Sequence, residues 1–293
     1  MTTLTAGVLR DFIASHPAAI VAELTAVRGS SPRNPGTFML ISPSAIVGTI
    51  GGGALEYLVI DRARQVMRQG IEADTLDIPL GPEIGQCCGG RVDIGLYAVS
   101  PQLARQLIER IEHAAAARPH VYLFGSGHVG KALARALSLL PLQVHVVDTR
   151  PDELADLPGN VEPVAVPMPE AVVRAAPAGS SYVILTHDHA LDFLIAFEAL
   201  KRLDSPYVGM VGSATKRARF KSWFLSEGGN PERLQRLVLP IGGAAFPRGL
   251  GDKRPEVIAA LAAAEVMVHI GHGEVSVSGG QGTQSVSGAV GGF

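Results

Sequence analysis

The residues with the clearest chemical role lie in a glycine-rich segment near the middle of the chain. Gly125, Gly127 and Gly130 follow a short apolar run at residues 120–124, in the order Gly-x-Gly-x-x-Gly. In this pattern the first glycine takes a tight turn, the second lets backbone N–H groups approach a phosphate, and the third lets a helix pack closely on the strand. We therefore expect a phosphate at the N-terminus of a helix that begins at His128.

Two strands and one helix must position this turn. The run 120–124 predicts the first strand, and an amphipathic helix is expected over 128–140, where Pro141 ends it. Residues 143–147 alternate as a second strand that ends at Asp148. An acid at this strand end commonly binds a ribose hydroxyl, so the unit is predicted to be Rossmann-like and to bind a cofactor. The alternative is a helix-packing turn without a ligand.

A histidine-rich segment follows a later strand, expected at residues 182–185. Ligands of open parallel sheets bind beyond the carboxyl ends of the strands. His187, Asp188 and His189 are therefore candidates for cofactor contact or proton transfer. Alternatively, Asp188 caps the next helix, expected over 191–203, and the histidines are packed or solvated.

Basic residues gather at the start of another helix, after a strand expected at 207–211. Ser213 can cap this helix, and Lys216, Arg217 and Arg219 add positive charge where a carboxylate is ordinarily preferred. This placement indicates an anionic ligand, with Lys216 and Arg217 as its contacts. A solvated helix face is the alternative.

The only two cysteines, Cys87 and Cys88, are adjacent and lie in the glycine-rich segment 81–90, directly after Gln86. Neighbouring side chains diverge, so the two thiols cannot easily chelate one metal ion together. Three uses remain open: a soft thiolate on a metal, a nucleophile for sulfur transfer, or a buried structural pair. Adjacent cysteines also exclude an ordinary disulfide framework and favour a reducing compartment.

Two further segments are candidates for anion binding. The loop 28–36 carries two arginines and several hydroxyls, and a solvated hairpin connection is its alternative. Three glycines at 51–53 precede a helix and leave backbone N–H groups uncovered. Glu56 in that helix either contacts a ligand or only favours the helix dipole.

Composition places the chain among ordinary globular proteins with two domains. The chain has 293 residues, of which 47% are apolar, and its formal net charge is −2. The small net charge makes nucleic acid an unexpected principal partner. No stretch resembles a membrane span or a leader, so a cytoplasmic protein without membrane attachment is expected.

The order of the predicted elements indicates an α/β protein. Residues 1–117 are expected to form an N-terminal α+β domain. A doubly wound parallel sheet of the Rossmann type is expected over 118–270. From residue 271 the composition turns to Gly, Ser and Val, which is typical of a flexible tail over 271–293.

Taken together, the motifs resemble those of the xanthine dehydrogenase accessory proteins, the XdhC/CoxI family of molybdenum cofactor chaperones. The resemblance covers about residues 1 to 270 and depends on an ordered set of motifs. They are GGGALE (51–56), GPEIGQCCGG (81–90), FGSGHVG (124–130), VVDTR (146–150), THDH (186–189), GMVGSATKR (209–217), PIGG (240–243) and RPEVIAALAAAE (254–265). The residues from 271 onward have no counterpart in the family pattern, and the PIGG junction is longer than the family's compact form.

Membership would imply a chaperone and not an enzyme. The protein would bind molybdopterin-ligated molybdenum, protect the cofactor during sulfuration by a cysteine desulfurase, and aid its insertion into xanthine dehydrogenase apoprotein as a homodimer. The terminal phosphate of the cofactor would meet the glycine turn or the basic residues 216, 217 and 219. Its molybdenum end would face Gln86, Cys87 and Cys88 across a domain cleft.

Two other functions are compatible with the same residues. An NAD(P)-dependent oxidoreductase would use the glycine turn and Asp148, with His187 or His189 as its acid or base. In the third possibility, the Rossmann half serves only as a partner surface for the desulfurase and the target enzyme. Asp148 favours the first of these, whereas the cysteine motif favours the chaperone.

Overall fold

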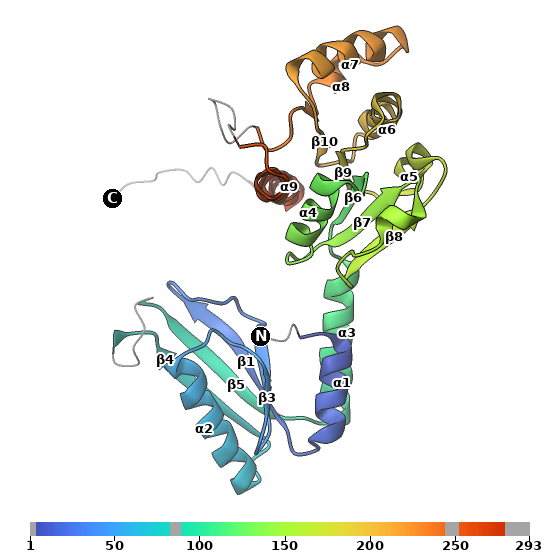
Figure 1. Cartoon of the computed structure of the whole chain (residues 1–293). Helices are drawn as coiled ribbons and strands as arrows, with labels where there is room; N and C mark the ends of the chain where they lie inside the picture. Colours follow the sequence, from blue (N-terminus) through green and yellow to red (C-terminus); the bar gives the residue numbers. More distant parts are fainter. Residues whose placement is uncertain (1–3, 83–88, 244–251, 279–293) are drawn as a thin grey trace, which may run out of the picture. The chain divides into compact units, whose positions relative to one another are not determined.

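The computed structural model describes residues 4–82, 89–243 and 252–278, with residues 272–278 as backbone only. Gln86, Cys87 and Cys88 therefore lie outside the described residues. The chain divides into two compact units, residues 1–117 and 118–293. Each unit has its own sheet and its own apolar core (Figure 1).

The N-terminal unit is an antiparallel five-stranded sheet with helices on both faces. The strand order is β3-β2-β1-β5-β4. The strands are β1 (Ile20–Arg28), β2 (Phe38–Ile41), β3 (Ile46–Gly48), β4 (Ala73–Pro79) and β5 (Arg91–Ala98), and the helices are α1 (Ala6–Ser15), α2 (Ala54–Gln69) and α3 (Pro101–Ala116). Side chains of the central strand β1 alternate between the two faces. Ile20, Ala22 and Leu24 pack with α2, whereas Val21 packs with α1 and α3.

The C-terminal unit is a parallel six-stranded sheet in the order β11-β10-β9-β6-β7-β8. Its strands are β6 (His120–Phe124), β7 (Gln143–Asp148), β8 (Val161–Ala165), β9 (Ser181–Ile184), β10 (Val208–Met210) and β11 (Leu237–Val238). The helices are α4 (His128–Leu137), α5 (Pro169–Ala175), α6 (His189–Lys201), α7 (Ala214–Ser226), α8 (Pro231–Leu234) and α9 (Pro255–Ser278), with the 3₁₀ turn η2 (Pro151–Leu154). This order, counted from β6, is the 3-2-1-4-5-6 order of the Rossmann fold.

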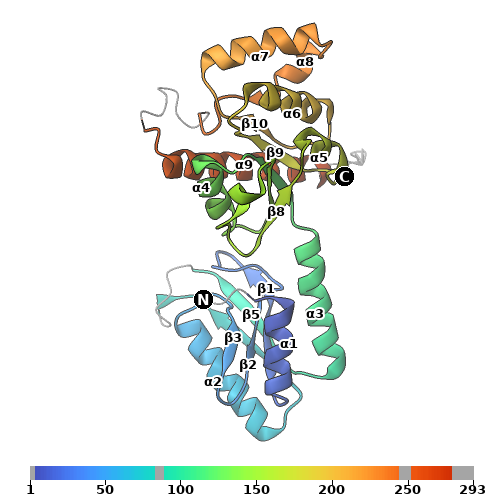
Figure 2. The same ribbon diagram turned by 45° about the vertical axis from the view of Figure 1, so that its right-hand side comes forward.

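Apolar side chains project from both faces of the parallel sheet, so helices cover both faces. Val121 and Leu123 of β6 pack with α4 and α9, whereas Tyr122 and Phe124 pack with α5, α6 and α7. Figure 2 shows α9 beside α4, as Figure 1 does. The strand order reverses between β6 and β9, which places the switch point of the fold at the carboxyl ends of these two strands.

The sequence did not predict α5 and α8, and other elements differ from it in their bounds. Helix α4 ends at Leu137, because Pro141 disfavours helical geometry at the preceding residue and the chain turns before reaching it. Strand β11 is only two residues long, too short for a periodic signal, and was not predicted. Helix α9 runs to Ser278, so residues 271–278 are helical and not part of a flexible tail. Adding a residue to an existing helix costs far less than nucleating one.

Among the described residues, no helix combines the length and the apolar character needed to cross a bilayer.

Candidate functional site

A small pocket lies at the switch point of the parallel sheet and is called the glycine-turn pocket here. Its volume is about 250 Å³. The walls come from Gly125 and residues 127–130 after β6, Leu185 to His187 after β9, Arg150 after β7 and Val211 after β10. Ligands of doubly wound sheets bind at this place, so the fold brings the predicted glycine turn and part of the histidine segment into one candidate site.

Each of the three glycines in the turn has a distinct environment. Gly125 has φ +110°, and a Cβ there would lie 2.6 Å from the carbonyl oxygen of Leu185. At Gly130 a Cβ would lie 2.1 Å from the carbonyl oxygen of Gly125, so this glycine lets α4 approach the turn. Gly127 caps α4 with φ −66°, and a Cβ there would meet nothing within 4 Å. Only Gly127 therefore faces open space at the helix N-terminus, where an anion is favoured.

The carboxylate of Asp148 is directed into the protein and is only 5% exposed. One of its oxygens, Oδ2, accepts hydrogen bonds from the backbone N–H of Ser126 at 2.9 Å and from its hydroxyl at 2.7 Å. The other, Oδ1, accepts from the backbone N–H and the Nε of Arg150. Burial by itself raises the pKa of Asp148, but the bonds from Arg150 and Ser126 outweigh it and hold the pKa well below the usual value.

This pairing gives Asp148 a structural role. It ties the second residue of the glycine turn to the end of β7, so the turn is held in place by the protein itself. An acid that binds a ribose hydroxyl needs an accessible oxygen, whereas both oxygens of Asp148 are already paired. The guanidinium of Arg150 is exposed and borders the pocket instead.

The histidine segment is divided between two roles. His187 is exposed and lines the glycine-turn pocket. Asp188 caps α6, where its side chain accepts from the backbone N–H of Ala190 at 2.8 Å. His189 is the first residue of that helix and is also exposed. The predicted alternative of a capping Asp188 is thus observed, and His187 is the member of the segment placed for ligand contact.

A buried ion pair joins the loops after β9 and β10. Lys216 donates to Asp192 Oδ2 and, at 2.9 Å, to the carbonyl oxygen of Val211. Asp192 is fully buried, and its Oδ1 accepts from the backbone N–H of Thr186 at 3.0 Å and from the Thr186 hydroxyl at 2.7 Å. The charge of Lys216 is therefore used to join two loops that border the pocket.

Arg217 lies one residue further along α7 and is directed elsewhere. Its guanidinium donates to the carbonyl oxygens of Leu239 and Leu237, at 2.6 and 3.3 Å. It does not border the glycine-turn pocket. Arg219 is exposed on the helix surface. The three basic residues at the start of α7 therefore lie in three different environments.

In the N-terminal unit, the chain's own side chains fill the predicted anion positions. Glu56 Oε1 accepts from the backbone N–H groups of Ile50 at 3.0 Å and Gly52 at 2.9 Å and from the hydroxyl of Thr49. This carboxylate therefore stands where an anion was expected at the triple glycine. Arg28 is paired with Asp93 and Asp77. Across the described part of both units, no group of three His, Cys, Asp or Glu residues is arranged to hold a metal ion.

Comparison with known proteins agrees with this architecture. The model of the XdhC Rossmann domain matches residues 121–266, and that of the XdhC and CoxI family matches residues 12–78. The chain belongs to the XdhC and CoxI family. Its two matched segments fall in the two compact units, one in each.

Two relatives of this XdhC family member are informative. The uncharacterized protein YqeB of Escherichia coli K12 is 25% identical over 268 residues, covering 84% of this chain and 42% of YqeB. The chain thus spans less than half the length of that relative. A crystal structure from Bacillus halodurans, described as a xanthine dehydrogenase, superposes with a TM-score of 0.74 at 18% identity and covers 92% of this chain and 96% of that one. This second likeness shows a shared fold.

Sequence patterns did not single out three residues that organise the site of this XdhC family member. Ser126 lies within the glycine motif but was not singled out, and Arg150 follows the strand-end acid. Asp192 is an acid in an otherwise apolar helix stretch, residues 191–197, and such a residue needs a buried partner. An acid in this apolar stretch could have predicted a buried ion pair, which the structure forms with Lys216.

Proposed function

We propose that this protein binds molybdenum cofactor as cargo, protects it during sulfuration and aids its insertion into a xanthine dehydrogenase. The proposal names a role in maturation and no turnover of the protein's own. Family membership supports the general role. The chemistry of the glycine-turn pocket supports the choice of a phosphate-bearing cargo.

The observation that carries the proposal is the contrast between Gly127 and Asp148. Gly127 leaves the N-terminus of α4 open to an anion, whereas the carboxylate of Asp148 is already hydrogen-bonded to Ser126 and Arg150. A dinucleotide needs both a phosphate position and an acceptor for its ribose hydroxyls. A pterin cofactor with one terminal phosphate needs only the first.

Two exposed groups complete the proposed phosphate site. Arg150 brings a guanidinium to the rim of the pocket, and His187 brings an imidazole from the opposite loop. Arg150 already donates through Nε and Nη2 to Asp148 and through Nη1 to Glu153, and the second N–H of each Nη group remains for a phosphate oxygen. Both side chains would act together with the N-terminus of α4, where the backbone N–H groups point at the ligand.

The proposed partners are the xanthine dehydrogenase apoprotein, a cysteine desulfurase and a second copy of this chain. The thiols of Cys87 and Cys88 stay the predicted contacts of the molybdenum, together with Gln86. Their segment lies outside the described residues, so the proposal for these three residues depends on the resemblance alone.

The test is molybdenum and pterin analysis of the protein purified from a host that makes the cofactor, with NADH titration of the same sample. We expect near-stoichiometric pterin and no NADH binding in the wild type. Gly127→Asp is the informative variant, because an aspartate is a good helix cap and should preserve folding. Its carboxylate occupies and repels the phosphate position, and at least a tenfold loss of pterin is expected.

The matched control is Gly159→Asp, which adds the same charge at an exposed position of the same unit where a Cβ meets nothing. It should retain the cofactor. Tight NADH binding without pterin would instead establish the NAD(P)-dependent oxidoreductase. Cofactor retention by Gly127→Asp, with delivery to the target enzyme lost, would favour the partner-surface function.

A further inference from the structure

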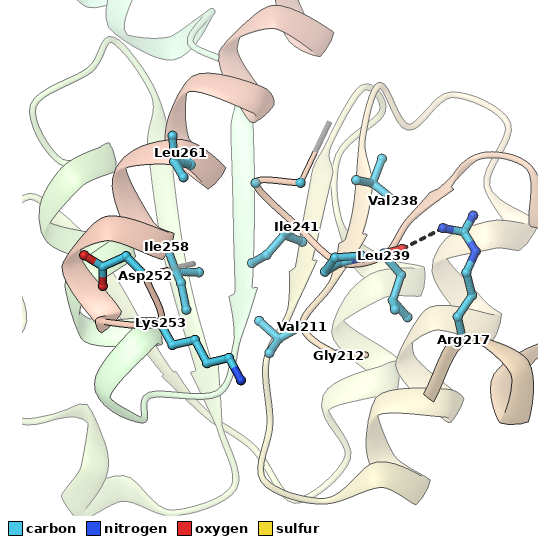
Figure 3. Close-up of a pocket in the computed structure, with 13 residues that line it drawn as sticks. Val211, Gly212, Arg217, Val238, Leu239, Ile241, Asp252, Lys253, Ile258 and Leu261 are labelled. Atoms are coloured by element: carbon cyan, nitrogen blue, oxygen red, sulfur yellow. Dashed lines mark hydrogen bonds between the residues drawn. The ribbon is translucent and has the colours of Figure 1, made fainter. Parts of the chain in front are cut away.

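A second and larger pocket lies beside the first, between the ends of β10 and β11 and the start of α9, and is called the β11–α9 pocket here (Figure 3). Its volume is about 560 Å³, within the range of small-molecule sites. The walls are mostly apolar. They include Val211, Val238, Ile241, Ile258 and Leu261.

The two pockets are neighbours along the carboxyl edge of the same sheet. Val211, the residue after β10, borders both of them. A ligand whose phosphate lies at the glycine turn can therefore extend past Val211 into the β11–α9 pocket. The same edge is where ligands of doubly wound sheets bind.

Polar groups in the larger pocket are few, and Arg217 in its wall already donates to the carbonyl oxygens of Leu237 and Leu239. Within the described residues, Lys253 makes no ion pair and no hydrogen bond, and Figure 3 shows its side chain extending toward Val211. The backbone of Gly212, also in the wall, makes no hydrogen bond to another described residue. Asp252 points away from Lys253 in Figure 3 and is paired with Arg254. The pocket thus offers apolar faces, a peptide group, and in Lys253 a cation that has no partner among the described residues.

A buried acid holds the wall in place. Glu265 of α9 is 8% exposed, and its Oε2 accepts from the backbone N–H of Gly242 at 2.7 Å and the hydroxyl of Tyr207 at 2.8 Å. A Cβ at Gly242, which has φ +68°, would lie 3.1 Å from the Cβ of Leu261. The turn after β11 is therefore packed directly against α9.

We propose that the β11–α9 pocket receives the flat ring system of the same ligand whose phosphate binds at the glycine turn. The occupant is a fused nitrogen heterocycle with a polar edge, and for the proposed cargo this is the pterin ring. Apolar side chains contact the faces of the ring, Gly212 offers a peptide group to its edge, and Lys253 donates to a ring acceptor such as the carbonyl oxygen. This assignment rests on the proposed function and adds the location of the ring to it.

The test compares pterin content among variants of the full chain purified from the cofactor-producing host. Ile258→Trp fills the pocket from α9, and Lys253→Glu reverses its charge without touching the core. We expect Ile258→Trp to lower pterin content at least tenfold and Lys253→Glu to lower it at least fivefold. The control Val268→Trp places the same ring on the same helix at a 55% exposed position outside the pocket and should match the wild type.

Each result decides the proposal. Wild-type pterin content in Lys253→Glu and in a folded Ile258→Trp overturns the ring location. If Ile258→Trp does not fold, Lys253→Glu decides alone. Pterin that is present in the wild type, lost in Gly127→Asp and unchanged in both pocket variants overturns only this assignment. Pterin that is absent from the wild type overturns the proposed function itself.

Discussion

Lys216→Met should destabilise the C-terminal unit strongly, although Lys216 was predicted to be a ligand contact. The substitution leaves the carboxylate of Asp192 fully buried with only the two donors of Thr186. It also removes a hydrogen bond to the carbonyl oxygen of Val211. Removing one partner of a buried pair costs about 3–5 kcal/mol, and the remaining Thr186 bonds favour the lower end, about 3 kcal/mol. The midpoint of thermal unfolding would then fall by roughly 6–12 °C for a unit of this size.

The assay is urea unfolding followed by the fluorescence of Trp223, the only tryptophan of the chain. Trp223 lies on α7 and contacts Phe193 and Phe197, so its emission reports on the C-terminal unit. The matched control is Lys201→Met. Lys201 forms an exposed pair with Glu198 and lies over the ring of Phe197, and losing both contacts should cost about 1 kcal/mol.

A double-mutant cycle completes the measurement. Asp192→Asn alone leaves Lys216 buried without its counter-ion, and the double variant removes both charges. We expect a coupling free energy of about 1–3 kcal/mol between the two sites. A loss of about 1 kcal/mol or less in Lys216→Met, no larger than that of Lys201→Met, would refute the argument that this pair holds the two loops together.

Three further predictions concern single positions. Gly125→Ala should lower the free energy of unfolding by about 2 kcal/mol or more, since φ is +110° and a Cβ would lie 2.6 Å from a carbonyl oxygen. The control Gly127→Ala should lower it by less than about 1 kcal/mol. Equal urea midpoints for the two variants would contradict this prediction. Glu56→Ala should speed hydrogen exchange at the amides it binds, whereas Glu56→Gln keeps an acceptor, and NMR exchange rates that do not differ would be inconsistent with the loop geometry. Burial lowers the pKa of His145 from 6.5, and His120 lowers it further, against an opposing effect of Glu162. The unfolded chain then binds more protons, so stability falls as pH drops below about 6.5. In urea titrations between pH 7 and 5, His145→Gln should reduce the dependence of the free energy of unfolding on pH. An unchanged dependence would mean that other groups cause it.

Local patterns determined the elements and the position of the glycine turn. Apolar strand, glycine turn, helix and strand-end acid follow one another within a short stretch, and the geometry of each depends mainly on its neighbours in the chain. The positive φ of Gly125 and the close approach at Gly130 both follow from one tight turn that leads into a helix. The cap formed by Asp188 is equally local, because its acceptor meets a donor two residues later.

Only the tertiary structure decided which charges are available to a ligand. Asp148 meets Ser126 across 22 residues of sequence, and Lys216 meets Asp192 across 24. The partners in each pair lie on different elements, so no periodicity or spacing connects them. The free energy cost of burying an unpaired charge favours their pairing once the sheet has formed. The β11–α9 pocket is likewise non-local, because a two-residue strand and a distant helix form its walls. The sequence therefore determined where the glycine turn lies, and the packing of the sheet and its helices determined which of the described side chains around it are paired within the protein.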